Sequence, residues 1–225
     1  MATAGEMVTA MADLFDVNAV TVESIDRSLS NAGLRKKGGR GRSAAHMTGP
    51  DVTHLAFALI LGAGMKDAPE KVSKVSRMLR QQATVQWRPD PDMPLSSLAE
   101  QVEQYQEHPA ADADLDVFPG GAALAAAETL GEGVAVLVDA IAEGEFEALD
   151  DVALNLQMSN IGPSARLAYA TRAGVLRMHY ETVGPEAERP VFERRFKLDE
   201  TLLQRIAKII TPQRPAVAGT GRHQP

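Results

Sequence analysis

The residues best suited to chemistry in this sequence are cationic and lie in one short segment. Residues 35–42, Arg-Lys-Lys-Gly-Gly-Arg-Gly-Arg, place five basic side chains among three glycines. Lys and Arg at this density can neutralise phosphates, and so many glycines disfavour a helix or a well-packed strand. The segment therefore predicts a flexible arm that contacts phosphate groups, although a solvated charged loop fits the same residues.

The distribution of charge supports an anionic partner. The 225 residues carry a net charge of -7, yet residues 27–50 contain six basic residues and no acidic one. Residues 89–165 show the opposite bias, with sixteen Asp and Glu and no Lys or Arg. A concentrated basic block in an acidic chain favours binding to a polyanion. The acidic stretch is open to two interpretations, a solvated linker or a surface that attracts basic groups.

Other residue types give little sign of catalysis. The absence of cysteine excludes disulfides, thiolate metal sites and a cysteine nucleophile. His46 and His54 have no third ligand at metal-site spacing, so we expect hydrogen-bonded or solvent-facing imidazoles. Gly38–Gly41 lacks the preceding strand that a nucleotide-binding fold requires, and Ser164 lies in a Gly-Pro-Ser-Ala turn rather than a nucleophile elbow. We predict a protein that is not an enzyme and needs no cofactor or metal.

Membrane insertion is not expected either. The longest nearly uncharged apolar stretch, residues 133–142, is interrupted by Asp139 and is shorter than the roughly 20 residues that span a bilayer. The first six residues show no basic run leading into an apolar one. These features predict a cytoplasmic protein without a membrane partner.

Residues 5–85 have helical periodicity. Apolar residues between 7 and 15 form one face of a first helix, and Thr21 is a plausible N-cap for a second. Gly33 suits the left-handed residue that ends a helix. Thr48-Gly-Pro-Asp51 resembles a capping box for a third helix, which Gly62 and Gly64 end. A fourth helix from Pro69 would bury Val72, Val75 and Leu79 and expose basic residues, namely Lys71, Lys74, Arg77 and Arg80.

A helix, a short turn, a second helix, a basic loop and a capped third helix form a recognisable order. Residues 7–60 resemble the winged helix-turn-helix of the MerR type. This resemblance implies duplex DNA binding, with residues 21–29 as the recognition helix and the basic loop as the wing. Aromatic residues usual in MerR proteins are replaced here by Ser28, Ser30 and residues 39–42. More loosely, the pattern resembles uncharacterised regulators encoded in bacterial prophages. A small helical bundle with a solvated basic loop remains the alternative.

These features single out eight side chains as candidate DNA contacts. On the second helix, Arg27 and Ser28 face away from Val22, Ile25 and Leu29 and would reach base edges, and Asn31 is a further exposed candidate for DNA contact. The other five would contact phosphates from the loop, namely Arg35, Lys36, Lys37, Arg40 and Arg42.

The rest of the chain predicts an α+β protein. Residues 86–121 combine a Pro-rich, acidic linker with one helix, and residues 122–143 form an Ala-rich helix whose apolar stripe is either core or a self-association surface. Alternating patterns around 152–156, 167–171, 176–180 and 191–198 predict a small antiparallel sheet, followed by a covering helix over 202–210. The domains are therefore expected at 1–85, 86–121 and 122–210, with a disordered tail at 211–225.

Three functions are compatible with this organisation. The first is a sequence-specific duplex-DNA-binding transcriptional regulator, acting as a homodimer or higher oligomer. The second is a phage DNA-packaging or assembly component with a helix-turn-helix. The third is a protein-interaction module without DNA binding, whose acidic middle binds a basic partner or the chain's own basic block.

Overall fold

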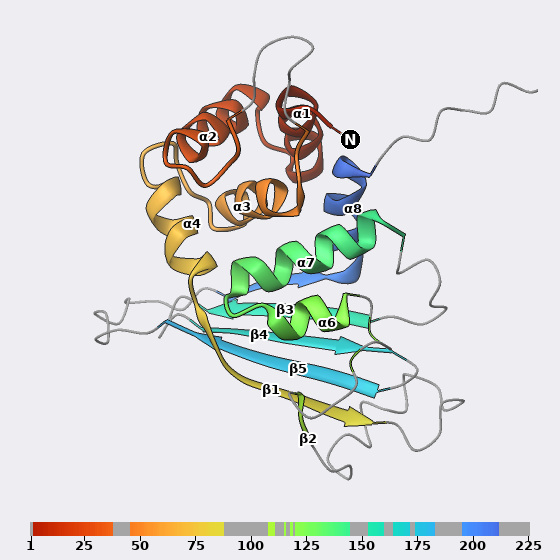
Figure 1. The fold of residues 1–225 in the computed structure, drawn as a ribbon. Coiled ribbons are helices and arrows are strands. Elements are labelled where there is room, and N and C mark those ends of the chain that lie inside the picture. The colour runs from red at the N-terminus through yellow and green to blue at the C-terminus, as the bar shows by residue number, and fades with distance from the viewer. Residues whose placement is uncertain are drawn as a thin grey trace, which may run out of the picture.

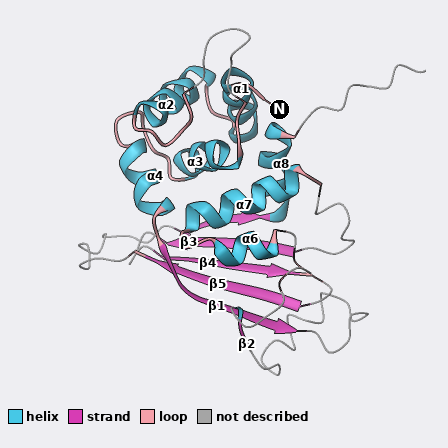
Figure 2. Cartoon of the chain, in the orientation of Figure 1, coloured by secondary structure: helices cyan, strands magenta, loops and turns pink. Residues whose placement is uncertain are grey.

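The computed structural model describes ten segments of the chain: residues 2–37, 46–87, 108–110, 115, 118, 120–144, 153–159, 164–171, 174–182 and 195–211. They form a layer of helices and a single antiparallel sheet, with further helices packed between the two (Figures 1 and 2). The predicted α+β class is confirmed. Among the described helices, none is both long and apolar enough to cross a membrane.

The helical layer comprises α1 (Ala4–Phe15), α2 (Ala19–Asn31), α3 (Gly49–Ile60) and α4 (Ala68–Ser76). Each forms because apolar residues recur along one side and meet in a common core. The prediction of Thr21 as the N-cap of α2 was wrong. Asn18 occupies that position, and its side chain accepts the N–H of Val20 at 2.9 Å, because an Asn oxygen reaches the second helical N–H as well as a Thr hydroxyl does.

The fourth helix is shorter than its periodicity suggested. It ends at Ser76, and the predicted helical residues beyond it form strand β1 (Leu79–Trp87). Leu79 is therefore 40% exposed instead of buried. Arg80, expected on the outside, is half-buried and donates to the carbonyl of Ala125 at 2.7 Å. Pairing with a distant strand gives the backbone N–H and C=O groups of these residues the hydrogen-bond partners that a continued helix would otherwise provide.

The Ala-rich segment divides into two helices, α6 (Gly121–Ala126) and α7 (Leu130–Ala142), where one was predicted. Thr129 is the reason for the break. Its hydroxyl accepts the N–H of Glu132, whose carboxylate accepts the N–H of Thr129 in return. This capping box starts a new helix and competes with continuation of the preceding one.

The sheet has six strands in the order β2-β1-β5-β4-β3-β6, and every neighbouring pair is antiparallel. The four predicted strands are present as β3 (Ala153–Ser159), β4 (Ser164–Ala170), β5 (Gly174–Glu181) and β6 (Arg195–Asp199). The sheet is larger than predicted because β1 pairs with β5 and β2 (His108–Pro109) pairs with β1.

Helix α7 joins the helical layer to the sheet. It lies between α3 and the sheet and is buried on most of its circumference (Figure 1). The last helix, α8 (Glu200–Ile210), contacts β6 and β3 but also packs against α7, α3 and α1, so it covers more than the sheet. One continuous apolar core consequently runs from α1 to β6. The predicted domain boundary at residue 85 falls inside β1.

Candidate nucleic-acid interface

The three-residue turn between α1 and α2 fixes the angle at which α2 leaves the core. Asp16 adopts a left-handed conformation with φ of 51°, which ends α1. Met7 and Met11 of α1 are fully buried, and Val22 and Leu29 of α2 are buried as well. Helix α2 is thus held by one face and presents the other outward.

The predicted base-reading residues lie on the outer part of α2. Arg27 and Asn31 are exposed, and Ser28 is half-buried. The Arg27 guanidinium donates to Glu23 at 2.7 Å, in a pair whose side chains are 70% and 56% exposed. Such an exposed pair contributes little stability, so the guanidinium is available to another partner. Val20, which the sequence analysis did not select, is 69% exposed one turn before Ser24.

The end of α2 directs the chain into the basic segment. Gly33 has φ of 77°, and the N–H groups of Gly33 and Leu34 donate to the carbonyls of Ser30 and Leu29. This Schellman motif confirms the predicted helix end at Gly33. The carbonyl of Leu34 lies 2.5 Å from Nδ1 of His54 on α3. His54 is therefore a hydrogen-bonded residue that anchors the start of the segment.

Arg35 points inward. Its Nε lies 2.5 Å from Oδ1 of Asp26 on α2, and the two side chains are 9% and 6% exposed. The two groups meet as an ion pair rather than as a well-aligned hydrogen bond. Burial raises the pKa of the Asp26 carboxyl, and the Arg35 guanidinium opposes part of that effect. This placement favours a role for Arg35 in positioning the segment, and its contact with phosphate stays a prediction.

Asp51 closes the base of the basic loop. One carboxylate oxygen accepts the N–H of Lys36 at 2.8 Å, and the other accepts the N–H of Thr48 at 3.0 Å and the Thr48 hydroxyl at 2.8 Å. The predicted capping box of α3 is thus confirmed, and the same side chain also holds the other end of the loop. The Lys36 and Lys37 side chains are exposed beside it. Arg40 and Arg42 lie outside the described residues.

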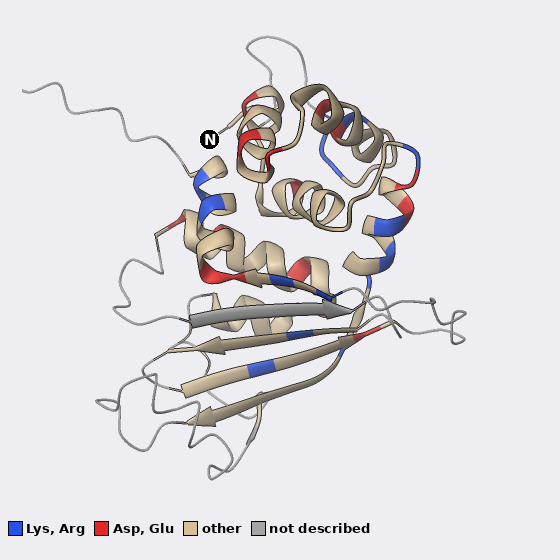
Figure 3. Ribbon diagram, turned by 180° about the vertical axis from the view of Figure 1, so that it is seen from behind, with Lys and Arg blue, Asp and Glu red and all other residues tan. Residues whose placement is uncertain are grey.

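Helix α4 adds basic residues that the sequence analysis did not include in the site. It packs against α2 and α3 and exposes Lys71, Lys74 and Arg77. In Figure 3, basic residues of α4 and of the neighbouring loops gather along one side of the helical layer. The sequence indicates the basic stripe of α4, but it does not show that α4 packs beside α2.

A carboxylate from the acidic half of the chain reaches the start of α3. Asp139 of α7 accepts the N–H of Gly49 through Oδ1 at 2.8 Å. A Cβ at position 49 would lie 2.6 Å from the carbonyl oxygen of Ala135, so only glycine permits this approach of α3 to α7. Burial raises the pKa of the Asp139 carboxyl, while the Gly49 N–H and the positive charge of Lys36 act in the opposite direction.

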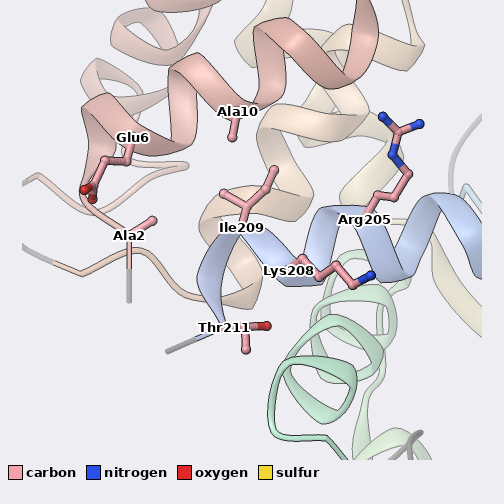
Figure 4. A pocket seen from close by; sticks show the side chains of 7 residues that line it. All are labelled: Ala2, Glu6, Ala10, Arg205, Lys208, Ile209 and Thr211. Atoms are coloured by element: carbon pink, nitrogen blue, oxygen red, sulfur yellow. The ribbon is translucent and has the colours of Figure 1, made fainter. Parts of the chain in front are cut away.

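A pocket of about 610 Å³ lies between α1 and α8 (Figure 4). Its charged residues are Glu6, Arg205 and Lys208, and the Glu6 carboxylate already accepts from Thr3, which lowers the pKa of Glu6. The lining contains no pairing of a nucleophile with a base. Across the described part of the chain, no group of three or more His, Asp or Glu residues is placed to hold a metal ion.

The candidate interface has three parts: the base of the basic loop with Lys36 and Lys37, the outer face of α2, and the basic face of α4. Comparison of the chain with protein-family models, with curated protein sequences and with solved structures found no match.

Proposed function

We propose that this protein is a sequence-specific duplex-DNA-binding regulator, in which α2 enters the major groove and the basic loop contacts the phosphate backbone. The observation that carries the proposal is the anchoring of the basic segment: Asp51 at the start of α3 binds both Lys36 and Thr48, and Arg35 joins the same segment to Asp26 of α2. A helix that presents polar side chains next to a basic loop can combine base contacts with phosphate contacts.

The arrangement of α1, α2 and α3 supports the proposed relation to the MerR-type winged helix-turn-helix. In this proposal Arg27, Ser28 and Asn31 contact base edges. Val20 adds an apolar contact, suited to a thymine methyl group. Lys36, Lys37, Arg40 and Arg42 contact phosphates, and Arg35 positions the loop. Helix α4 extends the phosphate contacts through Lys71, Lys74 and Arg77.

The salt dependence of DNA binding tests this proposal. The full-length protein is titrated with a labelled random duplex at several salt concentrations, and the K36A/K37A variant is compared with R205A/K208A. Both variants lack two exposed cations, but only the first pair lies at the proposed interface. Each phosphate contact that is removed lowers the log–log slope by roughly 0.9. We expect K36A/K37A to lower the slope by about 2 and R205A/K208A to leave it unchanged.

The proposal fails if the affinities of the two variants fall equally, because the effect would then come from net charge rather than from this interface. Light scattering on the protein–DNA complex addresses the assembly. We propose a homodimer or a higher homo-oligomer on DNA, and a monomeric complex at saturating protein would contradict that part. A large closed ring would instead favour a packaging component.

A further inference from the structure

The first turn of α3 is held by a carboxylate from the C-terminal half of the chain. Oδ1 of Asp139 on α7 accepts the N–H of Gly49, the first residue of α3, at 2.8 Å. Gly49 is buried, and the first N–H groups of a helix have no partner within the helix itself. Asp139 therefore caps α3 from a position 90 residues further along the chain.

Gly49 also lies in close contact with α7. A Cβ at this position would lie 2.5 Å from Oδ2 of Asp139 and 2.6 Å from the carbonyl oxygen of Ala135, which is one helical turn earlier on α7. The backbone of α3 therefore comes this near to α7 only because residue 49 has no Cβ. The hydrogen bond and the close packing act on the same residue, so α7 sets the position of Gly49.

Two further contacts connect Gly49 to the basic loop. Thr48 precedes Gly49 directly, and its N–H and its hydroxyl donate to Oδ2 of Asp51 at 3.0 Å and 2.8 Å. Oδ1 of the same carboxylate accepts the N–H of Lys36 at 2.8 Å. A shift of Gly49 therefore moves Thr48, and with it the acceptor that holds Lys36 at the other end of the loop.

We propose that Asp139 is a positioning residue for DNA binding, which fixes the geometry of the basic loop through Gly49. This inference rests on the proposed function, because it concerns the same interface. Asp139 is half-buried on α7, and α3 lies between α7 and α2 (Figure 1). Asp139 therefore acts on DNA binding through the loop and not by contact with DNA.

The physical basis of this role is preorganisation of the loop. A loop whose ends are already fixed loses less conformational freedom when its cations meet phosphates, so more of the interaction energy appears as affinity. Without the Asp139 oxygen, the buried N–H of Gly49 loses its acceptor, and the first turn of α3 relaxes toward another partner. Restoring the loop geometry then lowers the affinity. The C-terminal half of the chain thus controls an interface built from the N-terminal half.

Substitutions of Asp139 in the full-length protein test this inference by titration of a labelled duplex. D139N keeps an oxygen for the Gly49 N–H, D139A removes it, and both variants lack the charge. We expect D139A to bind more weakly than D139N by about fivefold or more. D139N should bind at least as tightly as wild type, because it also removes a negative charge whose field reaches Lys36. Glu143 is exposed one turn beyond Asp139, so E143A and E143Q are the matched controls and should bind alike.

A second variant disrupts the same contact from the α3 side. G49A keeps the Asp139 and Asp51 carboxylates but places a Cβ against Asp139 and Ala135, so it should weaken DNA binding as D139A does. The double variant G49A/D139A should bind no more weakly than G49A, because both substitutions break one contact. Thermal unfolding of each variant sets a temperature at which all of them are folded.

Three results would overturn the inference: equal affinity of D139A and D139N, the same loss of affinity in E143A as in D139A, or wild-type affinity of G49A. Failure of the proposed function looks different. In that case K36A/K37A would bind duplex DNA with the salt dependence of wild type, whereas failure of this inference alone leaves K36A/K37A with its lower slope.

Discussion

Arg35 and Asp26 form a buried ion pair that ties the basic segment to the side of α2. The Nε and Oδ1 atoms lie 2.5 Å apart, and less than a tenth of either side chain is exposed. The residue that begins the most basic stretch of the chain therefore turns its charge inward. Lys36 and Lys37 then follow with exposed side chains.

This pair predicts opposite outcomes for single and double substitution. Arg35→Ala leaves the Asp26 carboxylate buried without its partner, and we expect a loss of about 3–5 kcal/mol in the free energy of unfolding. The double variant D26L/R35M replaces both charges with apolar groups and should unfold within about 1 kcal/mol of wild type. Urea denaturation measures both values. DNA affinity of D26L/R35M equal to that of wild type would support a positioning role, whereas a large loss would indicate that Arg35 contacts phosphate directly.

Asp51 gives a second prediction, because one carboxylate serves three donors at both ends of the loop. Asp51→Ala leaves two N–H groups without partners, and we expect it to lower the free energy of unfolding by about 2–3 kcal/mol. It should also weaken DNA binding more than its stability loss explains, since the loop ends separate. Thr48→Ala removes only the hydroxyl and is the matched control. Equal DNA affinity in D51A and T48A, measured where both are folded, would contradict the role of Asp51 in shaping the loop.

Because Asp139 is partly buried, we expect the stability of the protein to depend on pH. Its pKa in the folded protein is raised above the ordinary value of 3.8, so the folded state binds this proton more readily than the unfolded chain does. The contribution of Asp139 to stability therefore decreases as pH rises from about 4 through its raised pKa. Above that pKa, the folded protein bears the full cost of burying the charged carboxylate. Asp139→Asn keeps an oxygen for the Gly49 N–H and does not titrate. We expect D139N to be at least as stable as wild type at pH 7 and to lose that advantage near pH 3.5.

Asp139→Ala is the comparison for this position. It removes the acceptor as well as the charge, so the Gly49 N–H has no partner there and the free energy of unfolding should fall by about 1–3 kcal/mol. Unfolding curves of the three proteins at pH 7 and at pH 3.5 provide the measurement. A stability difference between D139N and wild type that does not change with pH would show that the carboxyl titrates alike in the folded and unfolded chains.

The outer face of α2 predicts a change of sequence preference. Arg27→Ala and Asn31→Ala should alter which duplexes are selected from a random library, by about 1–3 kcal/mol for each interaction with a base that the substitution removes. Val20→Ser should reduce preference at thymine positions, because it takes away an apolar side chain. The K36A/K37A variant serves as the comparison and should weaken binding to all sequences alike. An equal loss on every sequence for R27A would assign Arg27 to the backbone.

The local sequence was sufficient wherever a feature depends on neighbouring residues. Gly33 ends α2 because the left-handed conformation is easy only for residues without a Cβ. Thr48 and Asp51 start α3 through groups three residues apart. The alternation of Leu167 and Tyr169, and of Leu176 and Met178, identified β4 and β5 because successive side chains of a strand face opposite sides.

The tertiary structure decided the features that depend on distant partners. The helical prediction for residues 5–85 fails at residues 79–85, because Leu79–Trp87 forms a strand whose hydrogen bonds are supplied by β5, about ninety residues later. Asn18 replaced Thr21 as an N-cap because several residues near a helix start can cap it and packing selects one. In the candidate site, the sequence indicated the basic loop and the outer residues of α2. It could not show that Arg35 meets Asp26, that Asp51 binds Lys36 or that Asp139 reaches Gly49, because each contact depends on how the helices pack.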